Sequence, residues 1–139
     1  MSAVEFTVPG APVGKGRPRM AAGRMYTPAK TASYESLVAY AAAAAMAGRP
    51  LLEGACSCIL DIVLPIPASW SKKRQAQALE GSLYPTTKPD KDNVIKAVYD
   101  AMNGVVWRDD VQACLGMQVK RYGAVPCVRV RVEMMEVAI

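Results

Sequence analysis

Acidic residues are concentrated in one stretch of a chain that is otherwise basic. The protein has 139 residues and a formal net charge of +5, yet five of its twelve acidic residues lie between Lys88 and Asp110. They are Asp90, Asp92, Asp100, Asp109 and Asp110. Carboxylates that lie close together raise each other's pKa unless a cation lies among them. The chain contains no histidine, and oxygen donors of this kind favour Mg²⁺ or Mn²⁺ over Zn²⁺. The stretch therefore predicts a site for a hard divalent cation.

An extended segment is expected to present the first two of these acids. Pro89 lacks a backbone donor and disfavours helical conformation at Lys88, so the chain should enter Asp90 as a strand or an extended loop. Side chains two residues apart on extended chain project to the same side. Asp90 and Asp92 should therefore point in the same direction.

A helix is expected next, because apolar residues from position 93 onward recur with the period of a helix that faces a core. Asp92 stands where an N-cap belongs, and Asn103 with Gly104 supplies the stop. Lys96 follows Asp92 by four residues, so its ammonium could orient a carboxylate, a water or a phosphate oxygen. The apolar stripe consists of Val94, Ala97, Val98, Ala101 and Met102.

The second acidic pair follows a short apolar run. Residues 105–107, Val-Val-Trp, are expected to resume extended chain and to deliver Asp109 and Asp110 at its end. If these elements pack as strand, helix and strand usually do, three carboxylates can converge beside the positive N-terminus of the helix. Other interpretations stay open. Asp92 could act only as a cap, Asp100 could be solvated or paired with a lysine, and the acidic pair could be a plain turn.

A long ordered motif joins these residues. It contains Lys88-Pro89-Asp90, Asp92-Asn93, Lys96, Asp100-Ala101, Asn103-Gly104, Trp107, Asp109-Asp110 and Gln112. In this order the residues resemble the signature of RusA-family endodeoxyribonucleases, the crossover junction enzymes that resolve Holliday junctions. The early run from Pro12 to Arg19, with Tyr26-Thr27-Pro28 after it, resembles the amino-terminal part of phage-type members. The resemblance spans residues 8–123.

The resemblance implies a role for individual residues. It assigns Asp90, Asp92 and Asp110 as ligands of Mg²⁺, with Mn²⁺ as a substitute, and Lys96 as a supporting catalytic cation. Asp109 is the alternative to Asp110, because the connection after the helix is one residue shorter than in the pattern. The resemblance also implies a homodimer, since a four-way junction has approximate twofold symmetry and both strands must be cut.

Two basic segments are candidate DNA contacts. The first carries Lys15, Arg17, Arg19, Arg24 and Lys30, interleaved with glycines, against one acid, Glu5, in the first thirty residues. Glycine-rich basic chain suits backbone contact with phosphates. The second is Lys72, Lys73 and Arg74 at the start of a short helix. Solvated surface is the alternative for both segments.

The composition indicates one domain over residues 1–139. Hydrophobic residues make up 52% of the chain, which is enough for a core. We expect an α/β (α+β) fold of RusA type, with a small mixed sheet of four to five strands packed with two to three helices. The Gly-Lys-Gly triplet at residues 14–16 lacks the spacing of a P-loop, so no nucleotide cofactor is expected. The four cysteines are expected to be reduced and half-buried, and a zinc site built from them is disfavoured.

The remaining elements follow from periodicity and turn residues. Strands are expected at residues 3–8, 56–64, 111–121 and 125–135, and helices at 29–47 and 70–79. The helix at 29–47 should bury Tyr34, Leu37, Val38 and Ala41. The strand at 56–64 is apolar on both faces and should be central. The last strand should turn Val128, Val130, Val132 and Met134 inward.

No apolar run reaches transmembrane length and the start of the chain lacks the pattern of a signal peptide. We therefore expect a cytoplasmic bacterial protein, encoded by the host, a phage or a prophage, without a membrane partner.

Three functions remain after these exclusions. The absence of histidine excludes nucleases that use it as base or zinc ligand. The first hypothesis is a magnesium-dependent homodimeric endonuclease that nicks four-way DNA junctions in recombination and repair and leaves 5′ phosphates. The second is a non-catalytic protein that binds branched DNA. The third is a different metal-dependent nuclease, in which Asp110 acts with Gln118 and Lys120.

Overall fold

The computed structural model describes residues 3–135, so the predicted domain limits at residues 1 and 139 lie outside the described chain. Its main sheet has four strands in the order β1-β6-β4-β5. These are β1 (Ala3–Pro9), β4 (Cys56–Leu64), β5 (Ala113–Tyr122) and β6 (Cys127–Met134). β4 and β5 are parallel, and the other neighbours are antiparallel. β4 is therefore an inner strand, as predicted.

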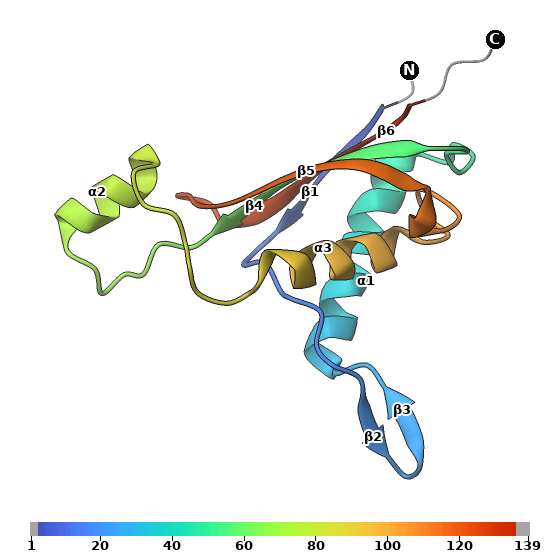
Figure 1. Ribbon diagram of the computed structural model, residues 1–139, viewed down its shortest axis with the longest axis horizontal. Helices are drawn as coiled ribbons and strands as arrows, with labels where there is room; N and C mark the ends of the chain where they lie inside the picture. Colours follow the sequence, from blue (N-terminus) through green and yellow to red (C-terminus); the bar gives the residue numbers. More distant parts are fainter. Residues whose placement is uncertain (1–2, 136–139) are drawn as a thin grey trace.

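Two helices, α1 (Ala29–Met46) and α3 (Lys91–Met102), pack on one face of this sheet and leave the other face open (Figure 1). A third helix, α2 (Lys72–Glu80), lies at one end of the molecule beyond the sheet. This arrangement confirms the expected α+β fold with a small mixed sheet.

A two-stranded ribbon, which sequence patterns did not predict, extends from the helical side of the molecule (Figure 1). It consists of β2 (Arg19–Ala21) and β3 (Arg24–Tyr26). Its two loop residues, Ala22 and Gly23, have φ values of +51° and +75°. Two positive values match the twist that a two-residue hairpin loop requires. The alternation is too short to be recognised in the sequence.

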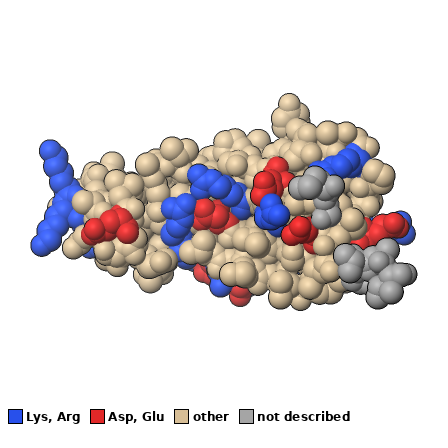
Figure 2. All heavy atoms as spheres, turned by 90° about the horizontal axis from the view of Figure 1, so that it is seen from above, with Lys and Arg blue, Asp and Glu red and all other residues tan. Residues whose placement is uncertain are grey.

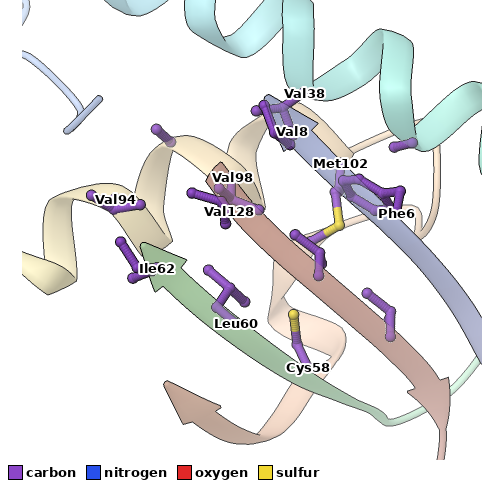
Figure 3. Close-up of a cluster of buried hydrophobic side chains, with 14 of the residues drawn as sticks. Phe6, Val8, Val38, Cys58, Leu60, Ile62, Val94, Val98, Met102 and Val128 are labelled. Atoms are coloured by element: carbon purple, nitrogen blue, oxygen red, sulfur yellow. The ribbon is translucent and has the colours of Figure 1, made fainter. Parts of the chain in front are cut away.

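The core lies between the covered face of the sheet and the two helices (Figure 3). Alternate residues of β4 and β6 point into it, including Leu60, Ile62 and Val128. α3 contributes four fully buried residues, Val94, Ala97, Val98 and Met102, and Ala101 is partly buried beside them. The predicted helical stripe is thus confirmed. Burial of its apolar surface holds α3 on the sheet.

Some burial predictions were wrong. Leu37 of α1 is 37% exposed, because the buried residues of this helix recur every three or four positions along a different stripe: Thr31, Tyr34, Val38, Ala42 and Met46. Met134 is also 37% exposed, since it ends the last strand. The four cysteines are free thiols, but three of them, Cys56, Cys58 and Cys127, are buried rather than half-buried.

The chain around α3 also differs from the prediction. The N-cap is Asp90, not Asp92, because the backbone is still extended at Asp90, with ψ of 140°, and turns helical at the next residue. Residues 105–107 form turns and isolated bridges instead of a strand. The fully buried Trp107 anchors them and donates from Nε1 to Asn103 Oδ1 at 2.9 Å. A short 3₁₀ turn, η1 (Asp110–Gln112), then leads into β5.

The open face of the sheet mixes apolar and charged side chains. Asp61 of β4 lies between Arg121 and Arg129, at 2.8 and 3.0 Å. Figure 2 views this face and shows basic and acidic side chains next to one another among uncharged ones. The exposed apolar residues include Ile59, Leu115, Met117 and Val119. Within residues 3–135, no helix has both the length and the apolar character needed to cross a membrane.

Two isoleucines on opposite faces of β4 test this arrangement. Ile62→Ala should lower the free energy of unfolding by about 2–5 kcal/mol, because Ile62 is fully buried and its loss leaves a cavity. Ile59→Ala on the same strand should cost less than about 1 kcal/mol, since Ile59 is 43% exposed. Urea unfolding of both variants measures the difference. Equal costs would contradict the assignment of the two faces.

Candidate active site

The outward face of α3 carries the charged residues of the motif. Asp92, Lys96 and Asp100 follow one another at intervals of four residues, which places them on one side of a helix. The apolar stripe packs on the sheet and so turns this side away from the core. Asp90 opens the helix, is exposed, and makes no capping hydrogen bond with its side chain.

The acidic pair after the helix is held by a glutamine. Gln112 Oε1 accepts hydrogen bonds from the backbone N–H groups of Arg108 and Asp109, at 2.9 and 3.2 Å. Its amide nitrogen donates to the carbonyls of Leu52 and Gly54, both at 3.0 Å. One side chain therefore ties the acidic corner to the segment before β4. In the sequence, only its place in the motif sets Gln112 apart from other glutamines.

The two acids of the pair have different surroundings. Asp109 Oδ1 accepts from the backbone N–H of Val111 at 3.2 Å, so this carboxylate caps η1. Burial raises the pKa of Asp110, and hydrogen bonding to Asp109 together with the negative charge of Asp100 raises it further. A carboxyl group with a raised pKa and carboxylate neighbours is typical of functional sites. This favours Asp110 over Asp109 as the functional acid.

The carboxylate of α3 whose negative charge raises the pKa of Asp110 is Asp100, in the last part of the helix. Asp90 lies ten residues before Asp100, which corresponds to about 15 Å of helix rise. The expected convergence at the N-terminus of the helix presumed that a strand would return the chain to that end. Residues 105–107 turn at the C-terminus of α3 instead.

The donors of the predicted site are of the kind that binds a hard divalent cation. All are carboxylate oxygens, which suit Mg²⁺ and Mn²⁺. Within the described part of the chain, however, no three Asp, Glu, Cys or His side chains form a group that could hold a metal ion. The predicted ligands Asp90, Asp92 and Asp110 therefore stay predictions.

The basic amino-terminal segment packs against both helices. A Cβ at Gly14 would lie 3.1 Å from the Cβ of Asn93, and one at Gly16 would lie 3.0 Å from Thr31 Oγ1. The backbone N–H of Lys15 donates to the carbonyl of Asn93 at 2.9 Å. Residues 14–16 are thus clamped between the starts of α1 and α3.

Lys15 differs from its basic neighbours. Its ammonium lies 2.6 Å from Glu35 Oε2 and 3.2 Å from Asp100 Oδ2, and its side chain is 16% exposed. Burial acts to lower the pKa of Lys15, but hydrogen bonds to Glu35 and Asp100 outweigh it, so that the pKa is raised. Arg17 and Arg19 are exposed.

A groove of about 880 Å³ runs between this segment and the start of α3. Its lining includes five basic residues and one acid. The basic residues are Lys15, Arg17, Arg19, Lys30 and Lys88, and the acid is Asp90. Lys30 belongs to the basic segment predicted to contact DNA, whereas Lys88 was not predicted as a contact, because only the folded chain brings it to this groove.

The other predicted DNA contacts lie outside this groove. Arg24 is on the exposed β3 strand of the ribbon. Lys72, Lys73 and Arg74 begin α2, at the end of the molecule away from the ribbon (Figure 1). Arg74 stacks over the ring of Trp70 at 4.1 Å. Two separate basic regions result.

Lys120 supports the segment that leads to Asp90. Its ammonium donates to the carbonyls of Thr87 and Pro89, at 2.8 and 3.1 Å. Lys120 and Gln118 pair with Ile62 and Leu60 of β4, and so both point to the side of the sheet that carries α3. From the sequence, Lys120 was expected only as an alternative catalytic residue. The observed contacts are with backbone oxygens.

The charge of Asp110 should reduce stability. Because its pKa is raised in the folded state, its ionised form destabilises the native protein at pH values above that pKa. Asp110→Asn in metal-free buffer at pH 7 should raise the melting temperature, because it removes this unfavourable charge. The gain should vanish below about pH 3.9, where the aspartate is protonated in both states.

Asp61→Asn is the control of opposite sign. Hydrogen bonding to Arg121 lowers the pKa of Asp61, with a further contribution from Arg129. Asp61 therefore stabilises the fold above its ordinary pKa, and this contribution is lost as the pH falls through its lowered value. Thermal melts across pH should show a loss at pH 7. A lower melting temperature for Asp110→Asn at pH 7 would contradict the assigned surroundings of Asp110.

Comparison with known proteins agrees with the motif. Residues 9–133 match the family described as Endodeoxyribonuclease RusA. The chain is also 38% identical over 140 residues to the uncharacterized protein YqaN of Bacillus subtilis (strain 168), which covers 95% of this chain and 96% of that protein. With the acidic face of α3, the Asp109-Asp110 corner and the basic groove in place, these matches identify the chain as a member of the RusA family of endodeoxyribonucleases.

Proposed function

We propose that this protein is a magnesium-dependent endonuclease that resolves Holliday junctions by paired nicks, one from each subunit of a homodimer. The observation that carries the proposal is the groove of about 880 Å³ in which five basic side chains surround the approach to Asp90. A groove in which basic side chains predominate attracts the phosphate backbone and positions it. Here it leads the backbone to the acidic face of α3.

The groove is suited to a DNA strand rather than to a small nucleotide. It is lined by arginine and lysine with little aromatic surface, and it is continuous with the ribbon that carries Arg24. Contacts of this kind hold phosphates without reading bases. We therefore propose recognition of junction shape, with Lys30 and Lys88 as contacts beside Arg17 and Arg19.

The proposed reaction is hydrolysis of a phosphodiester with a 5′ phosphate product. We propose Asp90, Asp92 and Asp110 as the carboxylates that hold Mg²⁺ or Mn²⁺. When bound, such an ion would activate water and stabilise the departing 3′ oxygen. Lys96 lies between Asp92 and Asp100 on the outward face of α3, where its ammonium can pair with a phosphate oxygen or orient a carboxylate.

A homodimer follows from the substrate rather than from this single chain. A four-way junction has approximate twofold symmetry, so a symmetric dimer can present one site to each of two opposed strands. Paired nicks then yield two duplexes whose 5′ phosphates a ligase can seal. We propose DNA recombination and repair as the setting.

Cleavage of synthetic DNA tests the function directly. Wild-type protein with Mg²⁺ should nick a four-way junction at symmetric positions and leave a linear duplex of the same sequence uncut, and EDTA should abolish the nicks. Asp90→Asn should reduce the rate at least about 100-fold, as loss of a group that acts in the transition state does, while junction binding in EDTA persists. A wild-type rate for Asp90→Asn would refute its assignment.

The same experiment separates the second function. A non-catalytic junction-binding protein would bind the four-way DNA with an affinity that falls steeply with salt, yet would not cleave it with Mg²⁺ or Mn²⁺. The basic groove alone would account for that result.

Two lysines separate the third function. Lys96→Ala should abolish cleavage under the proposal. Lys120→Ala should retain cleavage, at a reduced rate, because its ammonium supports the carbonyls before Asp90. Complete loss with Lys120→Ala and full activity with Lys96→Ala would favour a nuclease centred on Asp110, Gln118 and Lys120.

A further inference from the structure

One lysine that lines the groove also has its ammonium engaged by carboxylates of the two helices. The ammonium of Lys15 has two carboxylate partners, Glu35 on α1 at 2.6 Å and Asp100 on α3 at 3.2 Å. Arg17 and Arg19, two and four residues further on, are exposed. An ammonium has three N–H donors, and two carboxylates already engage it. Lys15 is therefore poorly placed to bind phosphate.

The backbone around Lys15 leaves its side chain little freedom to move elsewhere. The N–H of Lys15 donates to the carbonyl of Asn93, and the N–H of Gly16 donates to Thr31 Oγ1, both at 2.9 Å. Thr31 is 2% exposed. A Cβ at Gly14 or Gly16 would crowd α3 or α1. The two glycines thus allow the turn to approach both helices, and the ammonium extends from a fixed backbone.

The partner of Lys15 is itself a neighbour of Asp110. Asp100 lies near the end of α3, and α3 contacts the 3₁₀ turn η1, which begins with Asp110. Carboxylates that lie near one another repel. A cation on the other side of Asp100 offsets that repulsion and restrains the Asp100 side chain. Ion pairs therefore join Glu35, Lys15 and Asp100 beside the turn that carries Asp110.

From this arrangement we infer that Lys15 is a positioning residue, which acts through Asp100 to hold Asp110 in place for strand cleavage, and is not a phosphate contact. The inference rests on the proposed function for its effect on cleavage. It differs from the sequence expectation, which grouped Lys15 with Arg17 and Arg19 as DNA contacts.

Salt-dependent binding separates the two roles without any cleavage. The affinity of the protein for a four-way junction is measured in EDTA between 50 and 200 mM NaCl. Over this range of salt, affinity falls steeply for a protein that contacts phosphates. Arg17→Gln, the matched control, should reduce the slope of log affinity against log salt by about 0.9, as loss of one phosphate contact does. Lys15→Met should leave the wild-type slope unchanged. A slope reduced by about 0.9 in Lys15→Met would overturn the inference.

A double-mutant cycle tests whether Lys15 acts through Asp100. Cleavage rates are measured with Mg²⁺ over a range of junction concentrations that reaches saturation. Lys15→Met and Asp100→Asn should each lower kcat at least about tenfold and leave KM within about twofold of the wild-type value. The reason is that positioning in the transition state is lost while binding in the ground state is kept. The double variant should be no slower than the slower single variant. The inference would be overturned if the loss of kcat in the double variant equalled the product of the losses in the two single variants. It would also be overturned if the substitutions changed KM alone.

The same four proteins give a second cycle, on stability, which does not depend on cleavage. Urea unfolding in EDTA should show that the double variant is less destabilised than the sum of the two single variants, as residues in contact require. Additive losses would contradict the contact.

If Lys15→Met does not fold, Lys15→Gln takes its place, since it keeps an N–H donor but removes the charge. If the wild type cleaves no junction, the proposed function fails, whereas the slope and the stability cycle still decide the role of Lys15.

Discussion

Burial of one apolar stripe of α3 is the constraint on which the rest of the structure depends. Val94, Val98 and Met102 pack on the sheet and are fully buried, and each contributes roughly 1.5–3 kcal/mol by leaving water. This packing sets the rotation of the helix about its own axis. It therefore determines that Asp92, Lys96 and Asp100 point outward, and that the helix starts beside the basic groove and ends beside the Asp109-Asp110 corner.

The charged network on that outward face depends on close backbone packing. Gly14 and Gly16 allow the amino-terminal segment to touch both helices, and Lys15 then places a positive charge beside Asp100. The acidic corner has a similar fixed support in Gln112, which joins four backbone groups. The acids of the candidate site are held by polar side chains from distant parts of the chain, while the apolar core supports the helix that carries them. The raised pKa of Asp110 shows that this arrangement carries an electrostatic cost.

Most of the fold could be predicted because local periodicity reflects burial. The alternation in β1 and β6 and the stripe of α3 correctly identified the inward faces. Predictions failed where tertiary contacts overrode local pattern. Residues 105–107 resemble a strand, but Trp107 is buried under the helix end and the segment turns. Leu37 fits a helical stripe, yet the helix is rotated so that positions four apart, from Tyr34 to Val38, face the sheet.

The sequence by itself determined the kinds of chemistry available: carboxylates without histidine, a lysine one turn into a helix, and basic glycine-rich chain. These follow from residue type and short spacing, which folding does not change. Only the tertiary structure decided which groups meet. It brought Asp110 to Asp100 and Lys15 to Glu35, and it gathered Lys30 and Lys88 into one groove. Such pairings join residues far apart in the chain, and the packing of helices on the sheet determines them, whereas no local pattern encodes them.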